Sequence, residues 1–249
     1  MILITRPKEQ SKNLKSILNS KGYKTCLESL YKIKYLKKKI YYDKDNYYIF
    51  PSIHSVKSLI KSKQIKNFRD ANILVIGYKV KQALIRAGCK KIKLTLNDSD
   101  TLIRKIDTTK FKNQKFVYLC SNIINKDFLK KINNYQISFQ TKIIYKTIPV
   151  SKFQKKIIKN LQLGNISGAT FLSKLATDTF LNLSSRYSCL RYAKNINIYC
   201  ISERVAAPFI QKSFMSVYIA SKPNEDALIK SIKKRHFKWV IRLLNWKFY

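Results

Sequence analysis

The first residues of the chain join a predicted buried strand to a positively charged side chain. Ile2-Leu3-Ile4-Thr5 is a short apolar run typical of a buried strand, and Pro7 ends it because proline has no N–H to donate to a sheet. A helix is predicted next, from the apolar spacing of Leu14, Ile17 and Leu18. Ligands of open α/β sheets bind outside the carboxyl ends of the strands. Arg6 is therefore a candidate contact for an anion, the alternative being a solvated residue at the end of the strand.

Three serines follow predicted strands and precede predicted helices: Ser52, Ser173 and Ser202. A serine in this place caps the helix N-terminus, or it binds a carboxylate together with the backbone N–H groups of the helix. The residues alone leave both roles open. Basic side chains in the turns after the same strands can add affinity for anions or simply cover the surface: Lys79, Lys174 and Arg204.

Cysteine and histidine usage argues against a metal or disulfide framework. The five cysteines are odd in number and form no C-x-x-C pair, and the chain has only two histidines. We therefore expect no disulfide framework, no structural zinc and no histidine-based metal centre.

The formal net charge is +38, because the chain has 51 Lys and Arg residues but only 13 Asp and Glu residues. So large an excess of positive charge needs an explanation. A polyanionic partner is one interpretation: nucleic acid, a membrane surface or a polycarboxylate. Compositional drift is favoured, since only nine of the cations are Arg and the Lys are spread along the whole chain. A basic aromatic segment at 235–249 either contacts a membrane surface or a partner, or packs on its own domain.

Length and hydropathy indicate a globular protein of one large or two small domains. Hydrophobic residues make up 45% of the 249 residues. No apolar run approaches the ~20 residues that span a bilayer, and the start lacks the basic and apolar regions of a secretory signal. We therefore expect a cytoplasmic protein without a membrane span.

Predicted strands alternate with predicted helices along the chain. The strands are expected at 2–5, 47–50, 73–77, 91–94, 115–119, 140–147, 169–173, 197–202 and 216–220. The helices between and after them are expected at 56–60, 80–85, 101–106, 127–132, 153–163, 176–183, 205–210 and 224–232. Such alternation predicts an α/β fold with parallel sheets flanked by helices.

Two parts of the chain repeat one pattern. The strand, serine and helix of 48–56 parallel those of 170–176, and the strand, turn and helix of 75–94 parallel those of 200–219. We infer two α/β units built on one plan.

Taken in order, these motifs resemble the uroporphyrinogen-III synthase family. The shared motifs are the opening Thr5-Arg6-Pro7, the strand ends Phe50-Pro51-Ser52 and Val75-Ile76-Gly77, the Tyr-x-Thr of 145–147, Phe171-Leu172-Ser173, Ile201-Ser202 before a small-residue helix, and Ala220 with Pro223. The resemblance covers almost the whole chain. It implies two α/β domains joined by a two-stranded linker, with the active-site cleft between them. The first domain would be discontinuous, 1–32 plus 149–249, and the inserted domain would be 33–148.

The resemblance also implies a reaction. The family converts hydroxymethylbilane, a linear tetrapyrrole with many carboxylates, into cyclic uroporphyrinogen III. Water is lost, and ring D is inverted through a spiro intermediate. No cofactor or metal is implied, and the expected protein is a monomer whose partner is this small molecule and not nucleic acid.

Site residues carry over from the family position by position. Tyr145 matches the family's functional tyrosine, where a phenol can hydrogen-bond the departing hydroxyl; the alternative is an aromatic residue of the linker. Carboxylate binding would fall to Arg6, Ser52, Ser173, Ser202, Lys79 and Lys174. His54 follows Ser52 where the family often has a basic residue, and a surface side chain is its default interpretation.

Three positions depart from the family pattern. Val80 and Val205 stand where the family usually has Thr, which removes two hydroxyl donors, and the family's Leu-Arg-Gly turn is replaced near Cys120-Ser121. Two alternatives to an active synthase therefore remain open. One is a degenerate relative that binds a tetrapyrrole or another polyanion, and the other is a basic nucleic-acid-binding protein.

Overall fold

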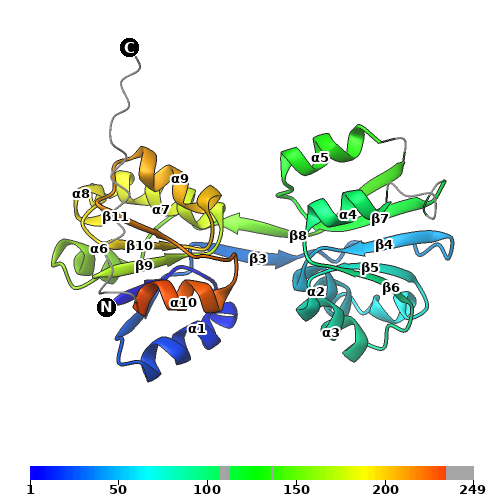
Figure 1. Cartoon of the computed structure of the whole chain (residues 1–249). Coiled ribbons are helices and arrows are strands. Elements are labelled where there is room, and N and C mark those ends of the chain that lie inside the picture. Colours follow the sequence, from blue (N-terminus) through cyan, green and yellow to red (C-terminus); the bar gives the residue numbers. More distant parts are fainter. Residues whose placement is uncertain (107–110, 112, 136, 234–249) are drawn as a thin grey trace, which may run out of the picture. The chain divides into compact units, whose positions relative to one another are not determined.

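The computed structural model describes residues 1–106, 111, 113–135 and 137–233. The basic aromatic segment at 235–249 lies outside the described residues. The chain divides into two compact units. Unit 1 contains Met1–Lys32 and the described part of Pro149–Tyr249, and unit 2 contains Ile33–Ile148 (Figure 1). No helix of the described part is long and apolar enough to cross a bilayer.

Unit 1 is built on a five-stranded sheet in the order β11-β10-β9-β1-β2. Its strands are β1 (Ile2–Ile4), β2 (Thr25–Leu27), β9 (Gly168–Phe171), β10 (Asn197–Cys200) and β11 (Ser216–Ile219). Every neighbouring pair in this sheet is parallel. The interior place of β1, between β9 and β2, fits its composition, because all three of its side chains are apolar and buried.

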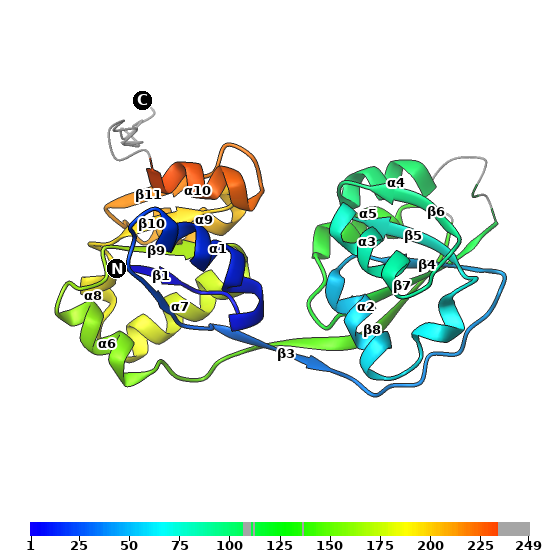
Figure 2. The same cartoon turned by 90° about the horizontal axis from the view of Figure 1, so that it is seen from below.

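Helices cover both faces of this sheet (Figure 2). On one face α1 (Lys8–Ser20) and α10 (Glu225–Lys233) bury Leu14, Leu18 and Leu228 against β1 and β10. On the other face α7 (Lys174–Arg186) and α9 (Glu203–Gln211) pack Phe180 and Phe209 around Phe171 of β9. Two further helices lie in the described part of the unit, α6 (Lys155–Gln162) and α8 (Leu190–Ala193).

Unit 2 repeats this architecture on a six-stranded sheet in the order β3-β8-β7-β4-β5-β6. The strands of this sheet are β3 (Tyr31–Tyr35), β4 (Asn46–Phe50), β5 (Asn72–Ile76), β6 (Ile92–Leu96), β7 (Lys115–Ser121) and β8 (Ser138–Pro149). The start of β3 and the last residue of β8 fall within the bounds of unit 1. The five strands from β8 to β6 are all parallel. The predicted class, parallel sheets flanked by helices, is therefore confirmed.

Two helical layers enclose the sheet of unit 2. The first layer is α2 (Ile53–Lys61) and α3 (Tyr78–Arg86), with the short 3-10 helix η1 (Ile65–Phe68) beside it. The second layer is α4 (Ser99–Ile106) and α5 (Lys126–Asn133). Each layer buries an apolar stripe, and the helices start at the carboxyl edge of the sheet because each follows a parallel strand.

The chain passes between the units in β3 and β8. The N–H of Val150 donates to the carbonyl of Leu30 at 3.0 Å, and the N–H of Leu36 donates to the carbonyl of Ile144 at 3.0 Å. As the residue number rises on one segment it falls on the other, so the two segments run antiparallel.

Candidate functional site

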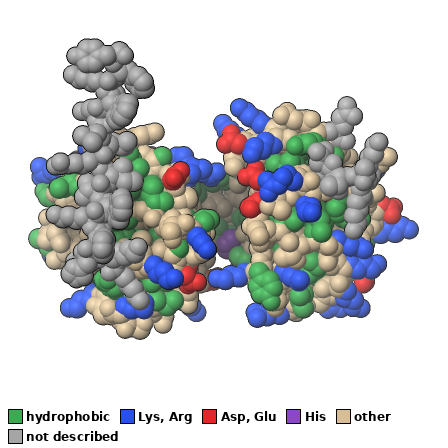
Figure 3. Space-filling model, viewed as in Figure 1, with side chains coloured by type: hydrophobic (Ala, Val, Ile, Leu, Met, Phe, Trp, Pro, Cys, Tyr) green, Lys and Arg blue, Asp and Glu red, His purple; other side chains and the backbone are tan. Residues whose placement is uncertain are grey.

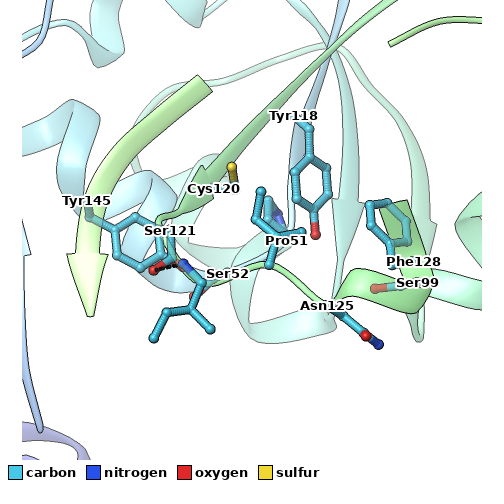
Figure 4. A pocket seen from close by; sticks show the side chains of 11 residues that line it. Pro51, Ser52, Ser99, Tyr118, Cys120, Ser121, Asn125, Phe128 and Tyr145 are labelled. Carbon is cyan, nitrogen blue, oxygen red and sulfur yellow. Dashed lines mark hydrogen bonds between the residues drawn. The ribbon is translucent and has the colours of Figure 1, made fainter. Parts of the chain in front are cut away.

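Hydroxyl groups from three neighbouring strands of unit 2 gather around a cavity of about 190 Å³ (Figure 4). The cavity lies where β4 and β7 end and where β8 passes them. Its lining combines hydroxyl, amide and apolar side chains: Pro51, Ser52, Ser99, Tyr118, Cys120, Ser121, Ile123, Ile124, Asn125, Phe128 and Tyr145. None of these described lining residues carries a charge, so the cavity offers hydrogen bonds and apolar contacts but no ion pair.

Tyr145 extends from β8 toward Ser52 and Ser121 (Figure 4). Its side chain is buried, and burial raises the pKa of the phenol above its ordinary value of 10.0, against the smaller opposing effect of a hydrogen bond with Ser52. The phenol is therefore protonated at neutral pH. A neutral phenol in a partly enclosed cavity is a hydrogen-bond donor to a ligand oxygen.

Ser52 serves two purposes at once. It is the N-cap of α2, where its hydroxyl oxygen accepts from the N–H of His54 at 3.2 Å. The same side chain lines the cavity and hydrogen-bonds Tyr145. The sequence left capping and ligand contact as alternatives, and the structure is compatible with both because the hydroxyl can cap with its lone pair and donate with its proton.

Two further side chains that line the cavity are uncharged at neutral pH. Burial raises the pKa of the Tyr118 phenol, with Cys120 and Tyr145 adding to the rise and a hydrogen bond with Ser99 opposing it. Burial also raises the pKa of the Cys120 thiol to about 12, against a smaller opposing effect of backbone hydrogen bonding at Lys142. Both groups keep their protons at neutral pH, so Cys120 is not a nucleophilic thiolate.

A small polar network fixes the end of β7 against β8. The hydroxyls of Ser121 and Thr147 lie 3.1 Å apart, and Asn122 Oδ1 accepts from the Ser121 hydroxyl at 3.0 Å and from the Thr147 N–H at 2.8 Å. The strand register shifts between Cys120 and Ser121. The sequence reasoning missed Ser121 and Tyr118 as lining residues, although the departure from the family pattern at Cys120-Ser121 was a signal for the first.

His54 is not the plain surface side chain expected from the sequence. It is half-buried, and one ring nitrogen, Nδ1, lies 2.9 Å from the hydroxyl of Tyr35. Its ring centroid is 5.6 Å from that of Tyr145. His54 therefore packs beside the candidate catalytic tyrosine.

In unit 1, Arg6 is not a solvated strand-end residue. Its guanidinium Nη1 lies 3.2 Å from a carboxylate oxygen of Glu225, and its side chain is 27% exposed. The second oxygen of Glu225 accepts from the side-chain amide of Asn13 at 2.6 Å. The positive charge of Arg6 is thus paired with a carboxylate of unit 1.

The two other unit 1 candidates after β9 also have partners. Ser173 caps α7 by accepting from the N–H of Ala176 at 3.2 Å. Lys174 forms an ion pair with Asp178 one turn later, with Nζ 2.8 Å from one carboxylate oxygen and 3.0 Å from the other.

The remaining candidates begin helices. Ser202 occupies the N-cap position of α9, but its side chain makes no capping hydrogen bond. Lys79 and Arg204 are exposed in the first turns of α3 and α9. Val80 and Val205, in place of the family's Thr, have side chains that are only 6% and 5% exposed.

Comparison of the chain with models of known protein families identifies the family to which it belongs. A family model described as uroporphyrinogen-III synthase HemD matches residues 12–230. The chain belongs to this family. Membership in the uroporphyrinogen-III synthases places it among the cyclising lyases of porphyrin biosynthesis.

Solved uroporphyrinogen-III synthases share the fold. The enzyme of Helicobacter pylori has a TM-score of 0.63 and 16% identity, covering 92% of this chain and 96% of its own. A mutant synthase of the extremely thermophilic bacterium Thermus thermophilus has a TM-score of 0.56 and 11% identity, covering 94% of this chain and 97% of its own. A search of the curated proteins finds no match.

Proposed function

We propose that Tyr145 is the residue with which this chain promotes loss of the terminal hydroxyl of hydroxymethylbilane. The observation that carries the proposal is a buried phenol, with a raised pKa, in a cavity lined by uncharged donors. Family membership supplies the reaction, and the resemblance of Tyr145-Lys146-Thr147 to the family's Tyr-x-Thr motif supports the role proposed for Tyr145.

The chemistry asks little of the protein beyond placement. The bond between the terminal methylene carbon and its oxygen breaks as the electron pair of the adjoining pyrrole moves toward that carbon. Tyr145 hydrogen-bonds the departing oxygen and gives it a proton as a general acid, so that the oxygen leaves as water; the proton that ring D later releases restores the phenol. The electron-poor methylene carbon is then attacked by ring D, and the spiro intermediate rearranges to the inverted ring. Most of the rate gain comes from holding a reactive substrate in the productive geometry.

Carboxylate binding is proposed for six residues: Arg6, Ser52, Ser173, Ser202, Lys79 and Lys174. Ser202 and the exposed Lys79 are the readiest to bind, since each begins a helix whose backbone N–H groups favour anions. Arg6 and Lys174 would have to exchange a carboxylate of this chain for one of the substrate. Val80 and Val205 leave only backbone donors at their positions.

A coupled assay tests the proposal. Purified hydroxymethylbilane synthase supplies the substrate, and the oxidised products are separated by chromatography. Isomer III above the no-protein control is expected. Isomer I alone, the product of spontaneous closure, from a protein shown to be folded would overturn the catalytic proposal and support the degenerate relative.

We also propose that the protein works as a monomer in the cytoplasm and does not bind nucleic acid. On the face shown in Figure 3, Lys and Arg side chains are scattered over both units and not gathered into one patch, which favours compositional drift as the origin of the charge. Sedimentation of the protein and titration with DNA and RNA at two salt concentrations test this. Micromolar affinity that falls steeply with salt would contradict it.

A further inference from the structure

Three aromatic side chains from three elements of unit 2 are joined in a row. Tyr35 ends β3, His54 lies in the first turn of α2, and Tyr145 lies on β8. The Tyr35 hydroxyl and His54 Nδ1 are 2.9 Å apart, and the ring centroids of His54 and Tyr145 are 5.6 Å apart with an angle of 47° between the planes. The outer tyrosine is thus connected through the histidine to the tyrosine of the cavity.

Contacts within and from helix α2 fix two members of this row, His54 and Tyr35. At its start, the backbone N–H of His54 is fixed on the hydroxyl of Ser52 at 3.2 Å. At its end, Lys61 Nζ lies over the ring of Tyr35, 4.5 Å from the centroid. A cation over an aromatic face is attractive. The Tyr35 ring is therefore contacted by the Lys61 side chain, while its hydroxyl lies within hydrogen-bond distance of His54.

The imidazole is in turn fixed in orientation. A histidine ring can rotate about its bond to Cβ, and two faces and two nitrogens are available to its neighbours. The hydrogen bond between the Tyr35 hydroxyl and Nδ1 selects one orientation, and in this orientation the ring packs beside Tyr145. Contact of this kind limits how far the Tyr145 ring can turn, while the hydrogen bond with Ser52 fixes its hydroxyl end.

We propose that Tyr35 and His54 form a positioning pair that holds the Tyr145 phenol toward the cavity. The inference rests on the proposed role of Tyr145. Neither residue of the pair lines the cavity among the described residues, so the pair acts through Tyr145 and not by touching the substrate. A misplacement of a reacting group by about 1 Å lowers the rate on the order of 100-fold. A side chain that prevents smaller movements is therefore expected to raise the rate about tenfold.

A double-mutant cycle tests whether the two residues act as one device. Tyr35→Phe removes only the hydroxyl, and His54→Phe keeps a ring beside Tyr145 but removes the nitrogen. Each is expected to lower kcat about tenfold with KM changed less than about twofold, and the double variant is expected to be no slower than either single one. His54→Asn keeps a hydrogen-bonding group for Tyr35 but removes the ring beside Tyr145, so it should lose at least as much as His54→Phe. Tyr41→Phe is the matched control, because Tyr41 is in the same unit and 80% exposed.

Tyrosine labelled with ¹³C at Cζ gives a readout that does not depend on turnover. The Tyr145 resonance is assigned by its loss in Tyr145→Phe, and its shift should move in Tyr35→Phe while the resonances of distant tyrosines stay. An unmoved Tyr145 signal, or rate losses that simply multiply in the double variant, would overturn the pair. If the wild type makes no isomer III, the proposed function fails, and the resonance alone then decides whether the pair positions Tyr145.

Discussion

The two units share one arrangement of five parallel strands, but the chain enters this arrangement at a different strand in each unit. Unit 2 reads β6-β5-β4-β7-β8 across its parallel strands, and unit 1 reads β11-β10-β9-β1-β2. In unit 2 these five strands follow one another along the chain. In unit 1 the places of β7 and β8 are taken by β1 and β2, the first strands to be synthesised. The same architecture is thus reached by a circular permutation of the strands, which allows a position-by-position comparison.

Equivalent positions carry different chemistry. Ile49 pairs with Tyr118 and Thr170 pairs with Ile4, and each of Ile49 and Thr170 lies three residues before a capping serine. Two residues beyond Tyr118 and Ile4 stand Cys120 and Arg6, which therefore occupy the same place in the two sheets.

At this place unit 2 has a neutral thiol that lines a cavity, and unit 1 has a guanidinium neutralised by Glu225. The comparison teaches that one scaffold can present uncharged donors at one sheet and a balanced charge pair at the other. The difference lies in the strand-end side chains and not in the topology.

The largest expected effect comes from removing one hydroxyl in unit 2. Tyr145→Phe should lower kcat for isomer III about 100-fold, because loss of a general acid typically costs at least that factor. Tyr192→Phe in unit 1, which removes a hydroxyl bound to Arg191, is the control and should keep full activity. Both are measured in the coupled assay. Equal rates for the two variants would contradict the proposal that the Tyr145 hydroxyl of unit 2 has a role in the reaction that the Tyr192 hydroxyl of unit 1 lacks.

The capping serines allow the sharpest comparison. Ser52→Ala and Ser173→Ala should each lower the free energy of unfolding by about 1 kcal/mol, because both remove an N-cap hydrogen bond. Only Ser52→Ala also removes a partner of Tyr145, so kcat should fall in that variant, whereas Ser173→Ala should raise KM. Urea denaturation and steady-state kinetics separate these effects. A matching loss of kcat in both would mean that the tyrosine contact is irrelevant.

Glu28 gives unit 1 a pH dependence that originates from a buried carboxyl group. It is the one acidic or basic side chain among the described residues that is fully buried, at 3% exposure. Burial raises its pKa above 4.5, against the opposing effects of the hydrogen bond from the Gln154 N–H and of Lys156. The folded state therefore binds the proton more strongly than the unfolded state, and this stability is full below about pH 4.5 and lost as pH rises through the folded pKa.

Glu28→Gln has no proton to lose. The difference in the free energy of unfolding between Glu28→Gln and the wild type should therefore grow as pH rises from about 4.5 to neutrality, in favour of the variant. Glu203→Gln, at an exposed site in the same unit, is the control. Denaturation curves at several pH values check this, and a difference that stays constant with pH would show that Glu28 titrates as it does in the unfolded chain.

The smallest expected effect concerns the ion pair of α7. Lys174→Gln should lower the free energy of unfolding by less than about 0.5 kcal/mol, because an exposed i,i+4 pair is screened by water. A rise in KM without this loss of stability would show that the lysine serves the substrate more than the helix. A loss above about 1 kcal/mol in thermal denaturation would contradict this estimate of the pair.

The sequence was a good guide to elements whose burial is uniform. The strands β4, β5 and β7 stand out because their apolar runs are buried on both faces. The residues did not predict β2 or β3. Strand β3 reads Tyr-Lys-Ile-Lys-Tyr, and its exposed lysines at alternate positions hide it from a search for apolar runs.

Only part of the candidate site could be predicted from the sequence, for a different reason. Tyr145 and Ser52 could be singled out one by one through the family pattern, but their contact joins residues far apart in the chain. Likewise nothing local to Arg6 indicates Glu225, which lies 219 residues away. Local patterns identify strand ends, and only the register between strands says which of those ends face each other.

The long separation between the parts of unit 1 has a consequence for synthesis on the ribosome. The hydroxyl of Thr5, next to β1, donates to the carbonyl of Thr170, 165 residues later, and β1 lies between β2 and β9 in the finished sheet. At about 5–20 residues per second, β1 waits on the order of ten to thirty seconds for its second neighbour. Unit 2 is translated whole during this wait, so a nascent chain can complete its second unit before its first, with an apolar strand edge left for a chaperone to shield.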